Sequence, residues 1–215
     1  MRILAIETST DTASLAGWHS GQQLWGEDFP AKRSLSGELA PRIAVGLEVL
    51  GGVDRIVVGL GPGSYAGVRI AIATAMGLQA VFGCELLGIP SPVAMQPLGA
   101  HFVVVGDARR GSWYFSEVIG GRCVIGPELV GSIEAVAARL AAAGVPLIMS
   151  EEASVGGSPL IVTPQASVLA HAASAGCGII QSGALEPLYL RDAHITRPTQ
   201  GGGKCQLLAL WALLP

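Results

Sequence analysis

The sequence is poor in charged and aromatic residues. Of its 215 residues, 13% are charged, about half the usual ~25%, and 5% are aromatic. The net charge of −3 gives the chain no general attraction to nucleic acid. Because 50% of the residues are hydrophobic, a free monomer would expose more apolar surface than monomeric proteins usually do, so we expect a protein partner.

Residues that commonly bind metals or form disulfides are few and scattered. The four cysteines form no C-x-x-C pair, and the four histidines form neither H-x-x-x-H nor H-E-x-x-H. These residues are Cys84, Cys123, Cys177 and Cys205, and His19, His101, His171 and His194. The pattern favours neither a zinc site nor a disulfide framework, and we expect no metal site.

A membrane-spanning helix is not expected. The apolar run from Ile70 to Cys84 is shorter than the ~20 residues that a spanning helix needs, and it contains Thr74 and Gln79. At the N-terminus, Glu7 comes too early for a signal peptide. We therefore expect a cytoplasmic protein.

Hydrophobic patterning predicts alternating strands and helices in the first half. Three strands come first, and then two helices alternate with two more strands. The predicted strands are 2–7, 13–18, 22–29, 56–60 and 86–89, and the predicted helices are 36–50 and 64–82. Ser36 is the expected N-cap of the first helix. This order predicts a mixed sheet covered by helices.

The second half repeats the opening of the first. A strand at 101–107 ends in Asp107, five residues follow, and a strand begins at Trp113, just as strand 2–7 ends in Glu7 and is followed after five residues by Ala13. The later predicted elements are strand 122–125, helix 132–143, strand 147–149 and helix 164–175. We expect a first lobe at 1–98, a smaller lobe at 99–198, and a flexible linker and tail at 199–215.

Two such lobes describe the actin-like ATPase class, whose folds are ribonuclease H-like and include hexokinase and Hsp70. In that class the two opening turns face each other and hold nucleotide phosphates. The candidate residues for nucleotide or tRNA contact are Glu7, Thr8, Ser9, Thr10, Asp107, Arg109 and Arg110. The second turn lacks the glycines that wrap a phosphate, so solvated arginines beside a capping acid are the alternative.

A glycine-rich turn at 59–70 formally fits the dinucleotide fingerprint G-x-G-x-x-[GA]. Pro62 removes one N–H that would face a pyrophosphate, and Glu85 precedes the next strand instead of ending it. Two interpretations stay open. The turn is a corner where glycines allow close backbone approach, or it contacts a nucleotide or a partner.

Helix 64–82 is thin and apolar on nearly every side, with Arg69 as its only charge. Either helix 36–50 covers its second face, or both helices present an apolar face to another protein. The candidate partner-binding residues are Leu39, Arg42, Ile43, Val45, Leu47, Val49, Arg69, Ile70, Ala73, Thr74, Met76, Gly77 and Ala80.

Four segments together resemble the bacterial TsaB (YeaZ) family, which is required to make threonylcarbamoyladenosine (t6A) in tRNA. They are Ile3–Thr10, Gly59–Ile70, Asp107–Gly111 and Pro187–Arg191. Two positions depart from the family pattern, since Glu7 replaces an aspartate and Leu35 replaces a histidine.

The resemblance implies a non-catalytic relative of the TsaD transferase. Helices 36–50 and 64–82 would pair with a TsaD-type transferase or with a second copy of the chain, and a TsaE-type ATPase would join the complex. The complex would modify adenosine 37 of ANN-decoding tRNAs, and the chain would meet tRNA only through it. The chain would have no cofactor of its own, and ATP or ADP would bind only at the joint with the partner.

The alternative is an enzyme that acts alone, either an actin-fold phosphotransferase or a glycoprotease-like peptidase. A phosphotransferase would hydrolyse ATP and lose this activity in Glu7→Ala and Asp107→Ala. A peptidase would need a metal or a nucleophile constellation, and the sequence shows neither.

Overall fold

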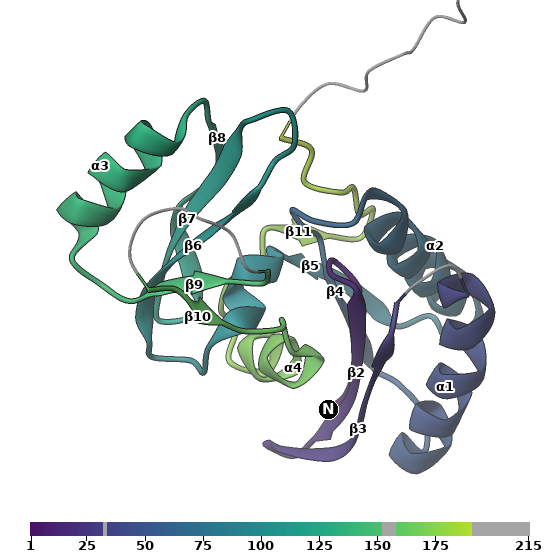
Figure 1. Ribbon diagram of the computed structural model, residues 1–215. Coiled ribbons are helices and arrows are strands. Elements are labelled where there is room, and N and C mark those ends of the chain that lie inside the picture. The colour runs from purple at the N-terminus through teal and green to yellow at the C-terminus, as the bar shows by residue number, and fades with distance from the viewer. Residues whose placement is uncertain (32–33, 152–157, 191–215) are drawn as a thin grey trace, which may run out of the picture.

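The computed structural model describes residues 1–31, 34–151 and 158–190 (Figure 1). The predicted tail at 199–215 and the last residue of the 187–191 segment lie outside these ranges. Two mixed sheets flanked by helices make up the described chain, as the alternation of elements predicts.

The first sheet has six strands in the order β11-β5-β4-β1-β2-β3. Its strands are β1 (Arg2–Glu7), β2 (Thr12–His19), β3 (Gln22–Pro30), β4 (Arg55–Gly59), β5 (Glu85–Ile89) and β11 (Gln181–Ser182). β1 pairs antiparallel with β2 and parallel with β4, which places the chain entering the glycine-rich turn beside the end of β1. Strand β11 is too short to have been predicted from its sequence.

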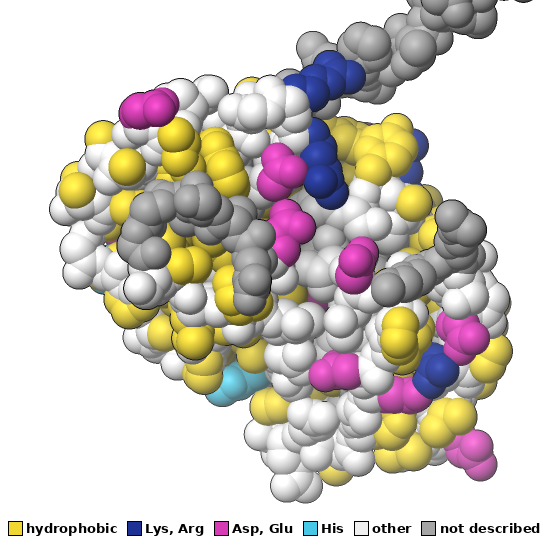
Figure 2. All heavy atoms as spheres, viewed as in Figure 1, with side chains coloured by type: hydrophobic (Ala, Val, Ile, Leu, Met, Phe, Trp, Pro, Cys, Tyr) yellow, Lys and Arg dark blue, Asp and Glu magenta, His cyan; other side chains and the backbone are white. Residues whose placement is uncertain are grey.

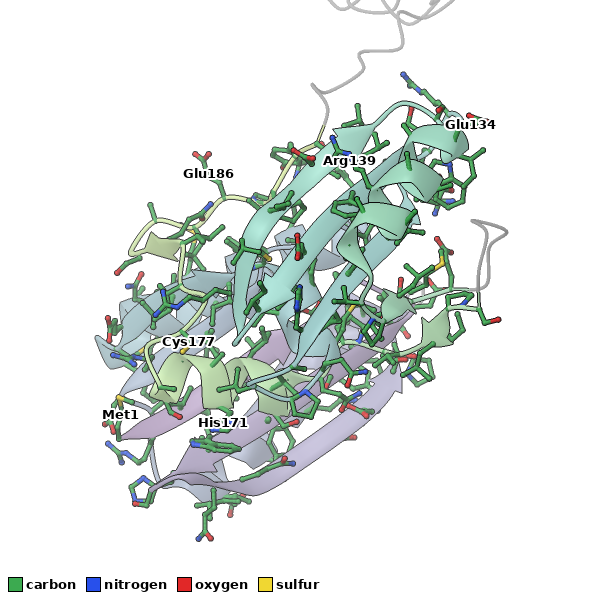
Figure 3. All side chains as sticks on the ribbon, turned by 90° about the vertical axis from the view of Figure 1, so that its left-hand side faces the viewer. Met1, Glu134, Arg139, His171, Cys177 and Glu186 are labelled. Atoms are coloured by element: carbon green, nitrogen blue, oxygen red, sulfur yellow. The ribbon has the colours of Figure 1, made fainter. Side chains whose placement is uncertain are left out.

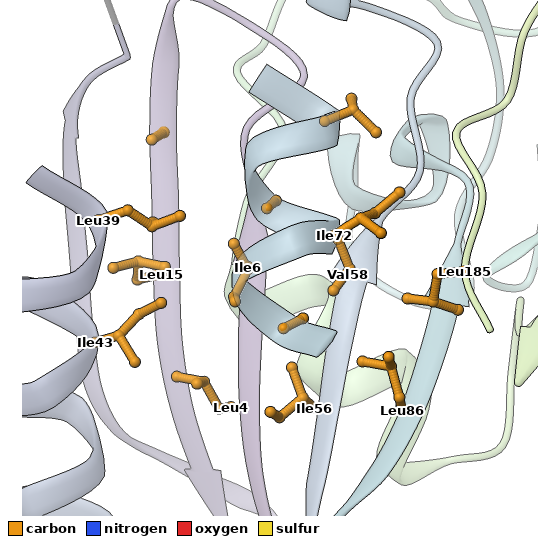
Figure 4. Close-up of a cluster of buried hydrophobic side chains, with 14 of the residues drawn as sticks. Leu4, Ile6, Leu15, Leu39, Ile43, Ile56, Val58, Ile72, Leu86 and Leu185 are labelled. Carbon is orange, nitrogen blue, oxygen red and sulfur yellow. The ribbon is translucent and has the colours of Figure 1, made fainter. Parts of the chain in front are cut away.

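Helices α1 (Leu35–Leu50) and α2 (Tyr65–Phe82) lie side by side over one face of this sheet (Figure 1). Figure 4 shows the core between these two helices and the sheet, where helix residues such as Leu39 and Ile72 meet strand residues such as Ile6 and Val58. Ser34 occupies the N-cap position of α1, so the prediction of Ser36 was wrong by two residues. Leu35 is then the first helical residue and is buried in the core.

Helix α2 begins as the sequence predicts. The Ser64 hydroxyl accepts a hydrogen bond from the Gly67 N–H at 3.2 Å, and Gly83 ends the helix in the left-handed conformation. By length and composition α2 could cross a membrane, but a core helix of a globular protein passes the same test. Here Val68, Ala71 and Ala75 are buried against the first sheet.

The second sheet has five strands in the order β10-β9-β6-β7-β8. These are β6 (His101–Asp107), β7 (Trp113–Ile119), β8 (Arg122–Val130), β9 (Leu147–Met149) and β10 (Leu160–Ile161). Helix α3 (Ile133–Ala143) packs on its outer face. β8 continues beyond the predicted 122–125 because a register shift in its pairing with β7 absorbs Gly126 and Pro127, which resemble a turn in the sequence.

The space between the two sheets is filled by helix α4 (Ala166–Ser174) and by the 3-10 helix η1 (Ser91–Met95). Figure 3 shows α4, marked by His171, against the first sheet and below the second. The Ala166 N–H donates to Ser14 Oγ of β2 at 3.0 Å. The predicted division at residue 98 separates the two sheets in sequence, but α4 and β11 follow it and still pack with the first sheet.

Candidate functional site

The end of β1 carries the first group of candidate residues, and it is buried. The Glu7 side chain has no exposed area, and its Oε1 accepts a hydrogen bond from the Ser9 N–H at 2.7 Å. Its Oε2 has no hydrogen-bond partner among the described residues. Burial raises the pKa of Glu7, while hydrogen bonds, first from Ser9, act in the opposite direction. A carboxyl group in this position favours its neutral form more than an exposed one does.

The glycine-rich turn lies directly against this end of β1. A Cβ at residue 59 would overlap Glu7 Oε2, one at 63 would overlap the Ser9 carbonyl, and one at 67 would overlap the Thr8 carbonyl. Each of these built distances is well under the 3.0 Å that real Cβ atoms keep. Glycine is therefore needed at 63 and 67 because two backbone segments touch, and at 59 because the buried Glu7 side chain fills the space, which is the corner interpretation of the turn.

The hydrogen bonds of the turn leave little for a pyrophosphate. The Gly61 N–H donates to Ser91 Oγ at 3.0 Å, and the Ser64 N–H donates to the Ser9 carbonyl at 2.6 Å. Pro62 has no N–H to donate. Thr8 Oγ1 donates to the Gly67 carbonyl at 2.9 Å. These polar groups fasten the turn to β1 and η1, so the amides of Gly61 and Ser64 are not free to bind a pyrophosphate as the dinucleotide fingerprint requires.

The second candidate turn has the same local geometry in an exposed setting. Asp107 Oδ1 accepts from the N–H two residues later, that of Arg109, at 2.6 Å, just as Glu7 accepts from Ser9. The Asp107 side chain is one-third exposed and also pairs with Arg109 Nη1 at 3.0 Å. Arg109 and Arg110 both have positive φ, at 65° and 57°, and are exposed. A capping acid with solvated arginines describes this turn.

The two turns are not joined to one another. Within the described ranges, no hydrogen bond or ion pair connects residues 7–10 with residues 107–110. The Thr10 hydroxyl donates locally to the Thr12 carbonyl at 2.9 Å. Within the same ranges, no three His, Cys, Asp or Glu side chains cluster as a metal ion would require.

Tyr114 of β7 is buried in the hydrophobic cluster between the two sheets, and sequence reasoning missed it. Burial, and then the negative charges of Glu151 and Glu7, raise the pKa of the Tyr114 hydroxyl. Gly106 on the neighbouring strand leaves the room for its ring, because a Cβ there would overlap the ring atoms. That glycine in an otherwise apolar strand was the available sequence signal.

The thirteen candidate partner-binding residues divide between the core and the surface. Leu39 and Ile43 are buried in the core, and Leu47 and Ile70 are partly buried against it. Thr74 is half-buried. Arg42 forms ion pairs with Glu27 and Glu38 and lies over the Phe29 ring. The exposed members are Val45, Val49, Arg69, Ala73, Met76, Gly77 and Ala80.

The exposed residues at helical spacing form an apolar stripe on each helix, and we call the two stripes together the α1–α2 face. It consists of Val45 and Val49 on α1, and of Ala73, Met76, Gly77 and Ala80 on α2. The spacing of four on α1, and of three, one and three on α2, places each set on one side of its helix. Val45, Val49 and Met76 are each about half exposed, at 50%, 47% and 47%. Helix α1 therefore does not cover the second face of α2.

Two solved structures share the fold of this chain. A solved structure from Pseudomonas aeruginosa, described as an uncharacterized protein with similarity to peptidase YEAZ, superposes with a TM-score of 0.68 at 23% identity and covers 88% of this chain and 99% of that one. YeaZ from Pseudomonas aeruginosa superposes with a TM-score of 0.61 at 21% identity, with the same coverage. These two likenesses establish the fold, and they confirm the predicted two-lobe α/β class.

Proteins similar in sequence to this chain include two TsaB proteins. An uncharacterized protein of Mycobacterium tuberculosis is 28% identical over 198 residues, which cover 88% of this chain and 91% of the relative. The tRNA threonylcarbamoyladenosine biosynthesis protein TsaB of Escherichia coli is 32% identical over 127 residues, and that of Haemophilus influenzae is 33% identical over 134 residues. The alignment spans 54% of the length of each TsaB protein.

The model of the TsaD family, described as tRNA N6-adenosine threonylcarbamoyltransferase, matches residues 46–166, more than half of the chain. The chain belongs to the TsaB/YeaZ branch of this family. Membership confirms the resemblance drawn from the four segments. The structure shows where the two residues that differ from the family pattern lie. Glu7 is a buried corner residue, and Leu35 fills the core at the start of α1, where a histidine would have had to bury a polar ring.

Proposed function

We propose that this TsaB-family chain is a non-catalytic subunit that pairs with a TsaD-type transferase through the α1–α2 face. The complex would threonylcarbamoylate adenosine 37 of ANN-decoding tRNAs. The observation that carries the proposal is the apolar α1–α2 face itself. It lies on two adjoining helices of the first lobe, and nothing in the described part of the chain covers it.

The small residues of α2 suit close helix–helix contact. Ala73, Gly77 and Ala80 carry little or no side chain, so the backbone of a partner helix could approach α2 closely. A Cβ at residue 77 would meet nothing within 4 Å, which means that the surface at Gly77 is open. The larger Met76, Val45 and Val49 side chains would supply the buried area, and Met adapts well to a partner's surface.

The two turns that are candidates for nucleotide or tRNA contact support the non-catalytic part of the proposal. Glu7 is buried, the neighbouring amides of Gly61 and Ser64 are engaged, and Asp107 caps its own turn. An acid that holds a metal-bound phosphate must be accessible and charged, and Glu7 is neither open to solvent nor set to ionise readily. The enzyme alternative, a phosphotransferase or peptidase acting alone, has no comparable structural support.

The remaining partners and the setting are part of the same proposal. The transferase would supply the chemistry, a TsaE-type ATPase would act on the complex, and ATP or ADP would bind only at the joint between chains. In the absence of a partner, the α1–α2 face could pair with a second copy of the chain. The expected location is the cytoplasm, where tRNA is modified.

A charge placed on the α1–α2 face tests the proposal. Ala73→Glu and Gly77→Glu should abolish or strongly weaken association with the TsaD-type transferase, measured by sedimentation of the mixed proteins, because a carboxylate buried at the joint loses its hydration. Ala141→Glu is the matched control, since Ala141 is exposed on α3, away from the α1–α2 face. Unchanged association in Ala73→Glu and Gly77→Glu would refute the interface.

A further inference from the structure

The start of α2 carries an aromatic–arginine cluster that the α1–α2 face does not include. The guanidinium carbon of Arg69 lies 3.8 Å from the centre of the Tyr65 ring and 5.3 Å from the centre of the Tyr189 ring. Arg69 Nε donates a hydrogen bond to the Tyr189 hydroxyl at 2.6 Å. Tyr65 and Tyr189 are nevertheless 55% and 49% exposed, so much of each ring faces solvent.

The cluster is held in place from two sides. Tyr65 and Arg69 are one helical turn apart on α2, which is the spacing at which side chains meet. Tyr189 comes 120 residues after Arg69, and its segment is fixed where the Leu188 N–H donates to the Leu60 carbonyl at 2.9 Å. Three planar groups are thus ordered before any ligand arrives, which reduces the entropy lost on binding.

The cluster also has unused binding capacity. Arg69 forms no ion pair with an acid in the described part of the chain. The Tyr65 and Ala66 N–H groups, at positions where a helix has no internal acceptor, find none elsewhere in the described ranges either. A cation and two free amides at the N-terminus of an 18-residue helix favour a negatively charged group.

Exposed aromatic rings beside a cation and free amides match the chemistry of one nucleotide, a flat base next to a phosphate. We propose that this cluster binds one unpaired nucleotide of an RNA strand, with the base stacked on Tyr65 and the phosphate held by Arg69. A paired base would keep its faces inside the helical stack and could not reach the ring. That the RNA is tRNA rests on the proposed function.

The surroundings of the cluster carry charges of both signs, so its attraction to RNA comes chiefly from Arg69 and the rings. Figure 2 shows Lys and Arg side chains over the turn between β6 and β7, with Asp and Glu side chains beside them, on the same face of the molecule as the hydrophobic side chains at the start of α2. Arg109 and Arg110 belong to that turn. Because the whole chain carries a net charge of −3, the attraction is local, and binding by the isolated chain should be weak and sensitive to salt.

The experiment measures binding of an unmodified tRNA transcript to the full chain, alone and in complex with the TsaD-type transferase, by fluorescence anisotropy. Tyr65→Ala should weaken binding about 5- to 150-fold, the range that corresponds to the loss of one base–aromatic stack. Tyr65→Phe keeps the ring and should bind within about twofold of the wild type, because the Tyr65 hydroxyl forms no hydrogen bond with the described residues. Arg69→Lys should also weaken binding, since an ammonium cannot stack flat.

Two further arms identify the ligand. A fully paired RNA duplex should bind less tightly than the transcript, and free AMP should compete poorly. Ultraviolet cross-linking followed by peptide mapping should place the RNA at Tyr65 or Tyr189. Equal affinity in Tyr65→Ala and the wild type, cross-links elsewhere, equal binding of the duplex, or competition by AMP at the affinity of the transcript would overturn the proposal.

The result separates this site from the proposed function. If Tyr65→Ala still associates with the transferase but tRNA binding is unchanged, the nucleotide site is wrong and the scaffold proposal stands. If tRNA binding by the chain alone depends on Tyr65 while no complex forms, the site stands and the scaffold proposal fails. A transferase that covers Tyr65 and blocks RNA would contradict the nucleotide site directly.

Discussion

Two glycines of α2 offer a matched test of the corner between α2 and β1. Gly67 lies in the first turn of the helix, against β1, and Gly77 lies on its open side. The Cβ of Gly67→Ala would overlap the carbonyl oxygen of Thr8, a backbone atom that cannot rotate away. The Cβ of Gly77→Ala would meet nothing within 4 Å. The same substitution of glycine by alanine is thus made once where the new methyl group meets the backbone and once where it meets solvent.

The structure sets the size of the difference. Gly77→Ala should raise the free energy of unfolding by about 1 kcal/mol, the gain in helix propensity. Gly67→Ala gains less of this because it lies at the helix end. It also forces β1 and α2 apart, at a cost of about 1–3 kcal/mol. The shift would strain the 2.9 Å hydrogen bond from Thr8 Oγ1 to the Gly67 carbonyl. We expect the two variants to differ by about 2–4 kcal/mol.

Urea unfolding of the isolated chain, followed by far-ultraviolet circular dichroism, measures this difference. The slope of unfolding free energy with urea should stay constant, so that the midpoints report stability alone. Low protein concentration keeps self-association through Gly77 out of the result. If Gly67→Ala were as stable as Gly77→Ala, the glycine-rich turn would not be a close-packed corner, and its phosphate-binding interpretation would reopen.

Three further predictions concern the buried acid, the core, and the hydrogen bond between Arg69 and Tyr189. Burial raises the pKa of Glu7 above its value in the unfolded chain, so the contribution of Glu7 to stability is complete below about pH 4.5 and is lost as pH rises through the folded pKa. The stability of Glu7→Gln relative to the wild type should therefore increase with pH in thermal melts, and a constant difference would contradict the burial argument. Leu39→Ala should cost about 2–5 kcal/mol in urea unfolding and Val49→Ala about 0.5 kcal/mol or less, because only Leu39 is in the core; equal costs would mean that α1 is oriented wrongly. Tyr189→Phe should cost about 1 kcal/mol by removing the hydrogen bond from Arg69, and an unchanged melting temperature would show that this bond adds nothing.

The sequence predicted regular elements better than their packing partners. Helix 64–82 was correct nearly to the residue because Ser64 and Gly83 mark its ends chemically. The apolar residues of helix 164–175 indicated a helix, but periodicity carries no information on which sheet it covers. The structure packs α4 on the first sheet, opposite α1 and α2. Strands of two residues, such as β10, depend on tertiary pairing and leave no pattern to detect.

The candidate site divided in a similar way. The motifs singled out candidate residues, but their exposure could not be predicted, since Leu39 and Val49 share a helix and differ only in direction. Contacts between distant segments were also out of reach. The bond between Arg69 and Tyr189 spans 120 residues, and the bond from the Ala166 N–H to Ser14 Oγ spans 152. Such contacts depend on the whole fold.

The central claim is that the chain acts through its α1–α2 face and performs no chemistry at its turns. Reconstituted t6A formation on an unmodified tRNA, with the TsaD-type transferase and each variant of this chain, tests it most directly. The account predicts loss of t6A with Ala73→Glu, and wild-type formation with both Ala141→Glu and Glu7→Gln. Loss of t6A with Glu7→Gln, together with full formation with Ala73→Glu, would contradict it.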